Sequence, residues 1–553
     1  MTDNPEPTTG RAAQRGTGAV ESRRARRARR RRMRKILAGS VGALLVLGTG
    51  GGVAAAGFVG LPTAARDLGI TQSEVPAGEA VFSCPPAPRI VEGSTAEGTD
   101  PEFAAESDSA ESSLRALVVS DAAERLPGSA VTTLEGESIK RLAPQLDEAE
   151  AAEASGASAE GYSGQKASVQ DNVREAGWAV LRAQPLGGLK SLAGQSRTYR
   201  ADDGDLAGFA ASSCRSPSND AWITGASTEV GRTALLMLAN PSASAATIDL
   251  DVVGSTGRAD AGNLRGIVLG PGQTKNIVLA GFIAEDPAVS VRVRSTGAPV
   301  NAVVQQSVLR GLTPGGVEYL EPGEAGGTSQ VVPGVVVQNE SNTPEPTGDL
   351  ADARPELQIT NPGSRDAEVN VRIFRTSGEV DVPGGATVEA PADSVMTIPL
   401  DELEEGTYTV ALQSSETVVA GARSVRGTED SGLDFAWAAS ATRLGNQHVL
   451  AVPRSARTHL VFGSAGGASQ VTIRPIMADG GIGRAEIIEL DGAATELFDV
   501  RGLDPEPVAL LIDAAGEAVY GAQRVQARNN GISTPSIPRA SEGQRSIAVD
   551  VTR

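Results

Sequence analysis

The chain has few of the side chains on which catalysis and ligand stacking most often depend. Its 553 residues include two histidines, three tryptophans and five tyrosines, and aromatic residues make up 3%. Histidine is the usual general base near neutral pH and a common metal ligand. His448 and His459 lie in strand-like surroundings without a cysteine or histidine cluster, so we expect two structural histidines. We expect no metal site and no bound cofactor.

Complete enzyme motifs are also lacking. Ser163 and Lys166 have the spacing of an SxxK motif, but the Ser-Asp-Asn and Lys-Thr-Gly elements that complete such a cleft do not occur. The glycine-rich run 463–467 lacks the GxSxG spacing of a nucleophile elbow, and 202–205 lacks the rest of an EF-hand loop. We expect turns at both places, with a weak calcium site as the alternative at 202–205. We name no catalytic residue and predict that the protein is not an enzyme.

Charged residues are missing from one long stretch, residues 36–65, which directly follows a basic segment. Ten of the fifteen residues from Glu21 to Lys35 are basic. A helix rises about 1.5 Å per residue, so roughly 20 apolar residues cross a hydrocarbon core of about 30 Å, and Ile36–Leu61 is long enough. Positive charge keeps a short flank cytoplasmic. We therefore predict a basic cytoplasmic tail over residues 1–35, a transmembrane helix over 36–61 and an extracytoplasmic remainder.

A cleaved signal peptide, which would release a secreted protein, is the alternative. Ala54, Ala55 and Ala56 supply the small residues of a cleavage site. The polar leader is long for such a signal, however, and the apolar run continues beyond the alanines. We therefore favour an anchor that is retained in the cell membrane.

Positive charge is scarce beyond the anchor. Of 49 basic and 68 acidic residues, 12 and 3 precede Ile36, which leaves 37 and 65 and a net charge of −28. An acidic exterior disfavours anionic partners such as nucleic acid. Arginines beside a membrane span help to set its orientation and contact anionic lipid headgroups. We expect the membrane as a partner through Ile36–Leu61, and no nucleic acid.

Cysteine is limited to Cys84 and Cys214. Thiols outside the cytoplasm are usually oxidised, and an even count suits one bridge. A Cys84–Cys214 disulfide would close a loop of about 130 residues, which the chain-entropy model values at up to ~5 kcal/mol. We predict this disulfide, with two unpaired buried thiols as the alternative.

The chain does contain a sequence module that is repeated several times. A strand with alternating apolar residues at 247–252 recurs at 368–373 and, more weakly, at 470–473, and such alternation predicts half-buried strands. Asn-Pro, which favours turn initiation, precedes the first two copies at Asn240 and Asn361. Related strands close the copies, at residues 303–308, 419–425 and 519–525.

The repeated strands predict an all-β fold, in which the membrane helix is followed by tandem antiparallel, immunoglobulin-like β-sandwiches. Half-polar strands argue against a parallel sheet. A β-propeller with two four-stranded blades per module is the alternative. We expect a diverged module at residues 62–224 and three further modules at 225–325, 326–445 and 446–553.

Two acidic segments rich in alanine, serine and glycine interrupt the first module, at about residues 92–113 and 147–164. They carry almost no large apolar residues, so we expect disorder there. We also expect a short helix near residues 171–176.

One set of turn and packing residues points to a known family: Cys214, Pro217, Trp222, Gly225, Gly231-Arg232, Leu236 and Asn240-Pro241. This set resembles the signature of a secreted, membrane-anchored actinobacterial family that is catalogued as a domain of unknown function. The resemblance implies an extracytoplasmic envelope protein and transfers no catalytic role. Within the set, Trp222 could stack on a sugar, but beside a disulfide a tryptophan more often packs in a core.

These features together predict a non-enzymatic scaffold or interaction protein of the cell envelope, with an envelope protein or a glycan as its partner. A cell-wall carbohydrate-binding protein is one alternative, which the scarcity of tryptophan and tyrosine disfavours. A hydrolase without a recognisable motif is the other, and the scarcity of histidine weighs against it.

Overall fold

A computed structural model of the chain describes residues 71–73, 77–91, 106–152, 162–260, 262–345, 347–540 and 547–549. Strands dominate this part of the chain, and its one α-helix is α2 (Glu148–Ala152). The described strands pair antiparallel throughout, for example in the central ladders of every sheet. The predicted all-β, antiparallel fold is therefore confirmed.

The predicted basic tail and transmembrane helix at Ile36–Leu61 lie outside the described residues. Among the helices that the structure does describe, none has the length and apolarity needed to cross a membrane.

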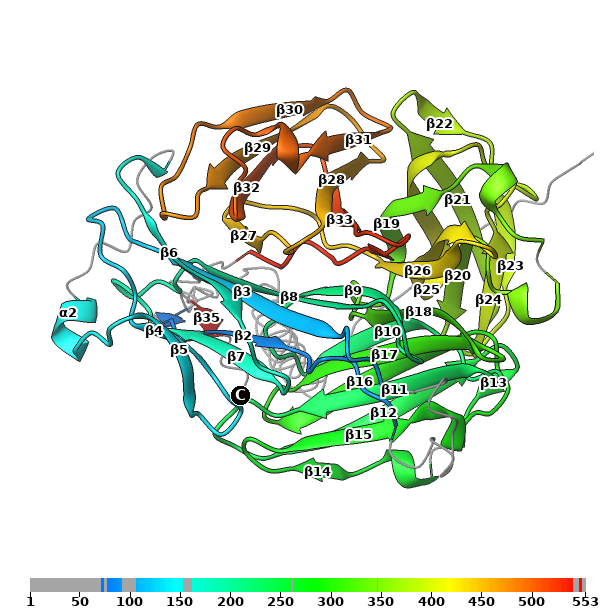
Figure 1. Ribbon diagram of the computed structural model, residues 1–553, viewed down its shortest axis with the longest axis horizontal. Helices are drawn as coiled ribbons and strands as arrows, with labels where there is room; N and C mark the ends of the chain where they lie inside the picture. The colour runs from blue at the N-terminus through cyan, green and yellow to red at the C-terminus, as the bar shows by residue number, and fades with distance from the viewer. Residues whose placement is uncertain are drawn as a thin grey trace, which may run out of the picture. The chain divides into compact units, whose positions relative to one another are not determined.

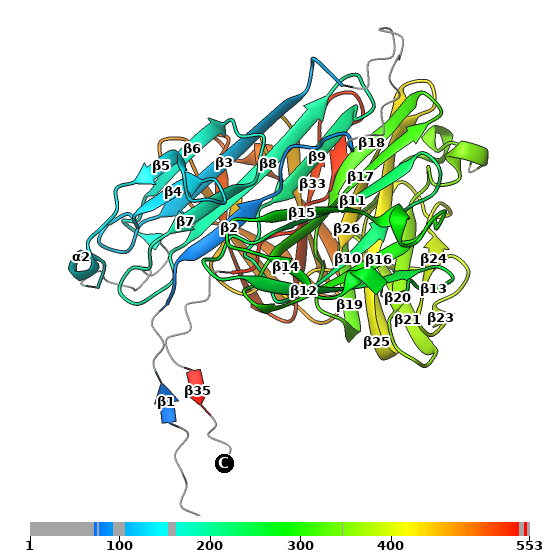
Figure 2. The ribbon, with the colours of Figure 1, turned by 90° about the horizontal axis from the view of Figure 1, so that it is seen from below.

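The described residues divide into two compact units. In the smaller one, β1 (Thr71–Ser73) pairs antiparallel with β35 (Ile547–Val549), with Thr71 opposite Val549 (Figures 1 and 2). The larger unit spans Glu74–Arg545, and it contains four pairs of sheets.

The first sheet pair is drawn from blue to cyan-green in Figure 1 and has the strand orders β2-β7-β4-β5 and β6-β3-β8-β9. Leu114 of β3 and Leu181 of β7 are fully buried in one core that the two sheets share. The bounds are β2 (Ala80–Cys84), β3 (Glu111–Val119), β4 (Ser129–Thr132), β5 (Ser138–Ala143), β6 (Ala167–Val173), β7 (Ala179–Ala183), β8 (Ala193–Ala201) and β9 (Gly208–Ser213).

The second sheet pair has the orders β10-β16-β12-β13, with β14 beside β12, and β15-β11-β17-β18. Leu236 of β11 and Leu250 of β12 are fully buried in its shared core. The bounds are β10 (Asp220–Ala226), β11 (Arg232–Ala239), β12 (Ala246–Gly254), β13 (Gly257–Arg258), β14 (Ile267–Leu269), β15 (Thr274–Val278), β16 (Val289–Gly297), β17 (Asn301–Arg310) and β18 (Thr313–Leu320).

In the third pair, one long strand runs through both sheets. The first part of β25 (Gly406–Thr428) pairs with β19 and β21, and its last part pairs with β20 and β26. β22 and β23 continue the first sheet, and β24 continues the second. The bounds are β19 (Gly327–Val337), β20 (Glu356–Asn361), β21 (Ala367–Arg375), β22 (Gly378–Val380), β23 (Thr387–Ala390), β24 (Ser394–Pro399) and β26 (Gly432–Ala439).

The fourth pair has the orders β27-β32-β29-β30 and β31-β28-β33-β34. Leu460 of β28 and Leu510 of β32 are fully buried in its core. The bounds are β27 (His448–Ala451), β28 (Arg457–Ser464), β29 (Ser469–Ile476), β30 (Glu486–Leu490), β31 (Ala494–Asp499), β32 (Ala509–Gly516), β33 (Tyr520–Gln526) and β34 (Ile532–Ser533).

The two Asn-Pro sites form the same turn, as their shared sequence predicts. Asn240 Oδ1 accepts the backbone N–H of Ser242, and Asn361 Oδ1 accepts that of Gly363, both at 3.0 Å. The side-chain amide of each asparagine donates to a carbonyl further along its module, at Leu269 and Ala390 respectively. Both asparagines are fully buried, so each ties its turn to a later strand.

Strand order and segment bounds differ from some expectations. Neighbours within a sheet, such as β2 and β7, are distant in the chain, which is not the up-and-down order of a propeller blade.

Of the segments expected to be disordered, 92–105 and 153–161 lie outside the described residues, whereas 111–113 belong to β3 and 148–152 form α2.

The expected helix near 171–176 is wrong. β6 continues to Val173, and Asp171 faces arginines of two other segments, with Arg115 Nε at 3.0 Å and Arg454 as its second partner. These long-range ion pairs override the local helical preference of the segment.

Candidate functional site

The four sheet pairs meet where the edge strands β9, β18, β26 and β34 come into contact. Asp434 of β26 lies there and is 2% exposed. Its Oδ2 accepts the backbone N–H groups of Phe209 in β9 at 3.0 Å and of Ile532 in β34 at 3.1 Å. Phe435 in β26 donates to Oδ1 at 3.0 Å, and Val317 in β18 donates its N–H as well. One carboxylate thus binds backbone from all four sheet pairs, and we call this place the central junction.

The backbone leaves little room around Asp434. Gly316 precedes Val317 and has φ 109°, a conformation that side chains with a Cβ rarely adopt. A Cβ at Gly316 would come within 2.2 Å of Asp434 Oδ1. Glycine at this position therefore permits the close approach of β18 to the carboxylate.

Glu318 is a second carboxyl group at the central junction, and it is 1% exposed. Its Oε1 accepts from Ser533 Oγ at 2.8 Å and from the N–H of Tyr319 at 2.9 Å. Its Oε2 is buried without a hydrogen-bond partner among the described residues. Burial raises the pKa of Glu318 well above its ordinary value, and burial also raises the pKa of Asp434, against the backbone N–H groups that favour its charged form. Since an unpaired buried charge is costly, Glu318 favours the neutral form.

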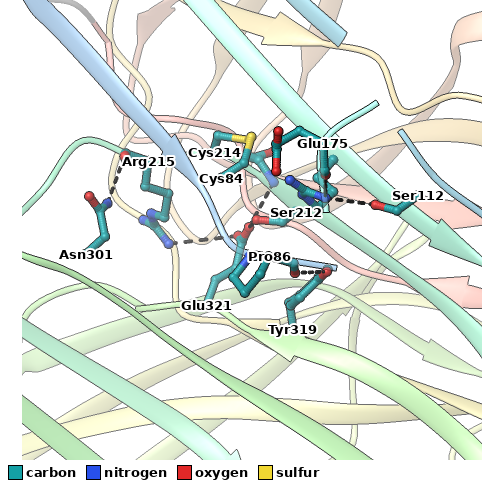
Figure 3. The surroundings of a disulfide bond; sticks show 12 residues. Cys84, Pro86, Ser112, Glu175, Ser212, Cys214, Arg215, Asn301, Tyr319 and Glu321 are labelled. Atoms are coloured by element: carbon teal, nitrogen blue, oxygen red, sulfur yellow. Dashed lines mark hydrogen bonds and ion pairs between the residues drawn. A yellow bond between two sulfur atoms is a disulfide. The ribbon is translucent and has the colours of Figure 1, made fainter. Parts of the chain in front are cut away.

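Glu321 extends this polar region toward the disulfide (Figure 3). Its Oε1 accepts from Ser212 Oγ and from the N–H of Ser213, both at 2.8 Å, and Oε2 accepts from the N–H of Ser536 at 3.1 Å. Arg215 Nη1 lies 3.9 Å from Oε2. Burial raises the pKa of Glu321, and Arg215 acts in the opposite direction. Glu321 therefore joins the first, second and fourth sheet pairs.

Cys84 and Cys214 form the predicted disulfide beside this carboxylate (Figure 3). The residues next to them are also joined, because the backbone N–H of Ser83 donates to the carbonyl of Arg215 at 2.9 Å and that of Arg215 donates back at 3.2 Å. The disulfide and this backbone pair fix the end of β2 against the segment that leads into β10.

A cavity of about 240 Å³ lies beside the disulfide, and Ser83, Arg215, Trp222, Asn301 and Glu321 are among the residues that line it. Asn301 Nδ2 donates to the carbonyl of Arg215 at 3.0 Å (Figure 3). Ser83 Oγ and Asn301 Oδ1 are buried without a hydrogen-bond partner in the described part of the chain. The cavity therefore combines an aromatic ring with hydrogen-bonding groups, which suits a small polar ligand.

Trp222 is 5% exposed and packs against Val253, Val395 and Val419. The guanidinium of Arg292 lies 5.6 Å from the centre of its ring. The predicted core role of Trp222 is confirmed, and the same residue is among those that line the cavity.

The two histidines are buried in the fourth sheet pair, on different sheets. His448 Nε2 accepts the backbone N–H of Gly445 at 2.9 Å, and its Nδ1 lies 2.7 Å from the carbonyl of Pro538. His459 lies opposite Arg524 across the β28–β33 ladder. Burial, and then the charge of Arg524, lowers the pKa of His459 to about 4, so this histidine is neutral near pH 7. The surroundings of both histidines are typical of structural residues.

The remaining sequence candidates do not converge on one site. Ser163 and Lys166 are exposed and lie outside any helix, and Lys166 Nζ contacts Glu124 at 3.2 Å. Residues 202–205 form an acidic turn, in which Asp203 accepts from Ser109 Oγ at 2.9 Å. The turn predicted for 463–467 is confirmed in part, because Gly463 and Ser464 still belong to β28 and the chain bends at 465–467. Within the described residues, no group of three or more His, Cys, Asp and Glu side chains could hold a metal ion.

Sequence reasoning missed the carboxylates of the central junction. Glu318 and Asp434 each precede an aromatic residue in a strand that is otherwise buried. A lone acidic residue inside a buried strand is the available signal, since such a group needs a partner. The partners themselves come from distant parts of the chain, and no local pattern indicates them.

Comparison with protein families gives a match. A model described as a family of unknown function (DUF5719) matches residues 167–501. The chain belongs to this family. The match includes Glu318, Glu321 and Asp434, and it covers the run from Cys214 to Pro241 that carries the resemblance noted from the sequence. Cys84 and Ile532 lie outside the matched residues. A comparison with curated proteins gives no match.

Proposed function

We propose that this DUF5719 protein is a non-enzymatic scaffold or interaction protein of the cell envelope. In this proposal, residues 36–61 hold it at the membrane, and the unit Glu74–Arg545 lies outside the cytoplasm. The observation that carries the proposal is the central junction, where the carboxylate of Asp434 accepts N–H groups from four sheet pairs. Such a junction holds several surfaces in a fixed relation, which is what a scaffold requires.

We also propose that each sheet pair is an antiparallel, immunoglobulin-like sandwich. Support comes from the cores, since each contains buried residues of both sheets of its pair. β25 passes from one sheet to the other, as strands at the corners of packed sheets do. The strands also support divisions near residues 225, 326 and 446, because β10 begins at Asp220, β19 at Gly327 and β27 at His448.

The disulfide supports the proposed location. Disulfides persist in oxidising compartments and are rare in the cytoplasm. The bridge between Cys84 and Cys214 joins residues 130 apart in sequence, so its formation requires that both segments reach such a compartment.

One end of the second sheet pair offers a surface for a partner. Val230 is 79% exposed and Leu312 is 70% exposed. They lie in neighbouring turns, because the N–H of Leu309 donates to the carbonyl of Gly231 at 2.8 Å. We call Val230 and Leu312 the apolar tip. Exposed apolar side chains in neighbouring turns offer apolar surface to another protein.

Crosslinking in living cells tests the scaffold role. A photoreactive amino acid is placed at Val230 in the full chain, and at Val268 as a matched control, since Val268 is also exposed, at 66%, but lies in β14. We expect one envelope-synthesis or division protein to be recovered repeatedly from position 230, and less of it when Leu312→Ser is added. Recovery of abundant membrane proteins alone, or the same products from both positions, would contradict the proposal.

Protease treatment of spheroplasts, whose cell wall has been removed and whose membrane is intact, tests the proposed membrane topology. We expect the unit Glu74–Arg545 to be degraded while residues 1–35 stay protected and membrane-bound. Protection of the whole chain would contradict the proposed topology. A shortened chain in the medium would instead support the secreted alternative.

The cavity beside the disulfide favours a second candidate function, the binding of a saccharide. Trp222 lines this cavity, and Ser83 and Asn301, which line it too, each have a buried oxygen without a hydrogen-bond partner among the described residues. Binding to purified cell-wall glycans tests this function. We expect Asn301→Asp to weaken binding if the cavity is the site, and equal binding by the variant would exclude the cavity.

A further inference from the structure

A groove of about 560 Å³ lies between the third and fourth sheet pairs. The ends of β19 and β25 form one side, and β31 and β33 form the other. Two arginines line it, Arg426 of β25 and Arg524 of β33, both partly buried. Thr407, Gln338 and Asn530 are among the polar residues that line it as well.

Neither arginine has a carboxylate within ion-pair distance among the described residues. Arg426 Nη1 donates to the carbonyls of Ala527 at 3.2 Å and Gly531 at 3.1 Å. Arg524 Nη1 donates to Thr407 Oγ1 at 2.8 Å, and its Nε is buried without a hydrogen-bond partner in the same described part. A guanidinium has five N–H donors, so Arg524 keeps donors beyond the one that bonds Thr407.

The two charges also act on one another. Burial lowers the pKa of Arg524, and the neighbouring charges of Arg457 and Arg426 lower it further, whereas Asp499 opposes them. Burial likewise lowers the pKa of Arg426, against the charge of Asp434. Two partly buried like charges that face one groove are unfavourable unless an anion joins them.

Many other arginines among the described residues have acidic partners. Arg232 pairs with Asp352 at 2.7 Å, and Arg372 pairs with Glu379 at 2.6 Å. Beyond residue 35 the chain has 65 acidic and 37 basic residues, so acidic side chains are in surplus. Glu405, which also lines the groove, is exposed, and it accepts from Asn339 Nδ2 at 3.4 Å. Arg426 and Arg524 thus line one groove without an ion pair among the described residues, although acidic side chains are in surplus.

We propose that this groove binds an oxyanion, the phosphate or carboxylate group of a ligand, between Arg426 and Arg524. The planar guanidinium presents paired N–H donors that match both kinds of oxyanion. Thr407 lines the groove as well, and its hydroxyl, which accepts from Arg524 Nη1, can also donate its O–H to an anion. The groove does not include the apolar tip or the cavity beside the disulfide, so this inference is independent of the scaffold role.

Anion binding to the purified full chain tests the proposal. Inorganic phosphate and glucuronate are titrated separately at low ionic strength, because salt screens such contacts, and the thermal unfolding midpoint Tm is followed together with the heat of binding. We expect a saturable response to at least one probe. Arg524→Gln and Arg426→Gln should each weaken that response at least tenfold.

Arg365→Gln is the matched control, since it removes the same charge from an exposed arginine that pairs with Glu416. It should respond as the unaltered protein does. Arg524→Lys keeps the charge and should restore part of the affinity that Arg524→Gln loses. A response to phosphate alone identifies a phosphate ligand, and a response to glucuronate alone identifies a carboxylate ligand. No saturable response to either probe, or equal responses in all variants, would overturn the proposal.

Discussion

The carboxylate of Asp434 accepts the backbone N–H of Phe209 at 3.0 Å, although the two residues are 225 positions apart in the chain. Ile532 donates to the same oxygen at 3.1 Å. Phe209 belongs to the first sheet pair and Ile532 to the fourth, while Asp434 belongs to the third. The hydrogen bonds of this one side chain therefore tie the stability of each sheet pair to that of the others.

Asp434→Asn tests this coupling directly. The amide keeps one acceptor oxygen but turns an NH2 group toward backbone N–H donors, which are then buried without a partner. An unsatisfied buried donor costs about 1–3 kcal/mol, so with two such groups we expect a loss of roughly 3–5 kcal/mol. Urea unfolding followed by tryptophan fluorescence measures it.

Asp220→Asn is the control for this substitution. Asp220 is exposed and pairs with Arg292 at 2.6 Å, and exposed ion pairs contribute about 0–1 kcal/mol. Similar losses from the two variants would show that Asp434 is no more than an ordinary ion-pairing residue.

The raised pKa of Glu318 predicts that the stability of the folded chain depends on pH. Burial raises this pKa in the folded chain, so the folded form binds the proton more tightly than the unfolded form does. This contribution is fully present below the unfolded pKa of about 4.3 and is lost as pH rises through the folded value. We expect the contribution of Glu318 to Tm to decline from about pH 4 upward, so that the difference in Tm between the unaltered protein and Glu318→Gln, which is neutral at every pH, changes over this range. Identical Tm profiles for the two proteins would show that Glu318 does not contribute.

The Cys84–Cys214 bridge predicts sensitivity to reductant. It joins residues 130 apart, and removal of such a constraint costs up to ~5 kcal/mol in the chain-entropy model. We expect dithiothreitol to lower Tm of the unaltered protein and to leave Tm of the double variant Cys84→Ser, Cys214→Ser unchanged. Mass spectrometry should find two alkylated thiols only after reduction, and free thiols in the untreated protein would contradict the bridge.

At Gly225, the second and third sheet pairs pack so closely that there is no room for a larger residue. Gly225 has φ 95°, and a Cβ there would lie 2.3 Å from the ring of Trp437. That indole is fixed, since its Nε1 donates to Thr224 Oγ1 at 3.1 Å. We expect Gly225→Ala to destabilise the protein by about 2–4 kcal/mol through overpacking and backbone strain. Gly262→Ala, where no atom lies within 4 Å of the added Cβ, should change the free energy of unfolding by less than ~1 kcal/mol.

Local patterns predicted the parts of the fold that local forces determine. The alternating residues at 247–252 and 368–373 lie in β12 and β21, because one face of each strand packs in a core and the other does not. Asn240 and Asn361 form the turns that their Asn-Pro sequence indicates. The disulfide followed from the count of two cysteines and the expected compartment.

The parts that the sequence did not indicate depend on distant partners. Asp434 has donors at residues 209, 317 and 532, which no spacing in the chain brings together. β25 continues through 23 residues from one sheet to the other, whereas the sequence indicated a strand at residues 419–425. Arg426 and Arg524 lie on strands of different sheet pairs, so the groove between them exists only in the folded chain.

The central claim is that the central junction couples the four sheet pairs into one cooperative unit, and differential scanning calorimetry tests it most directly. We expect the disulfide-intact full chain to show one dominant unfolding transition over Glu74–Arg545, with a calorimetric enthalpy close to the van't Hoff enthalpy. Asp434→Asn should separate this transition into two or more. Several resolved transitions in the unaltered protein, each unmoved by Asp434→Asn, would contradict the account.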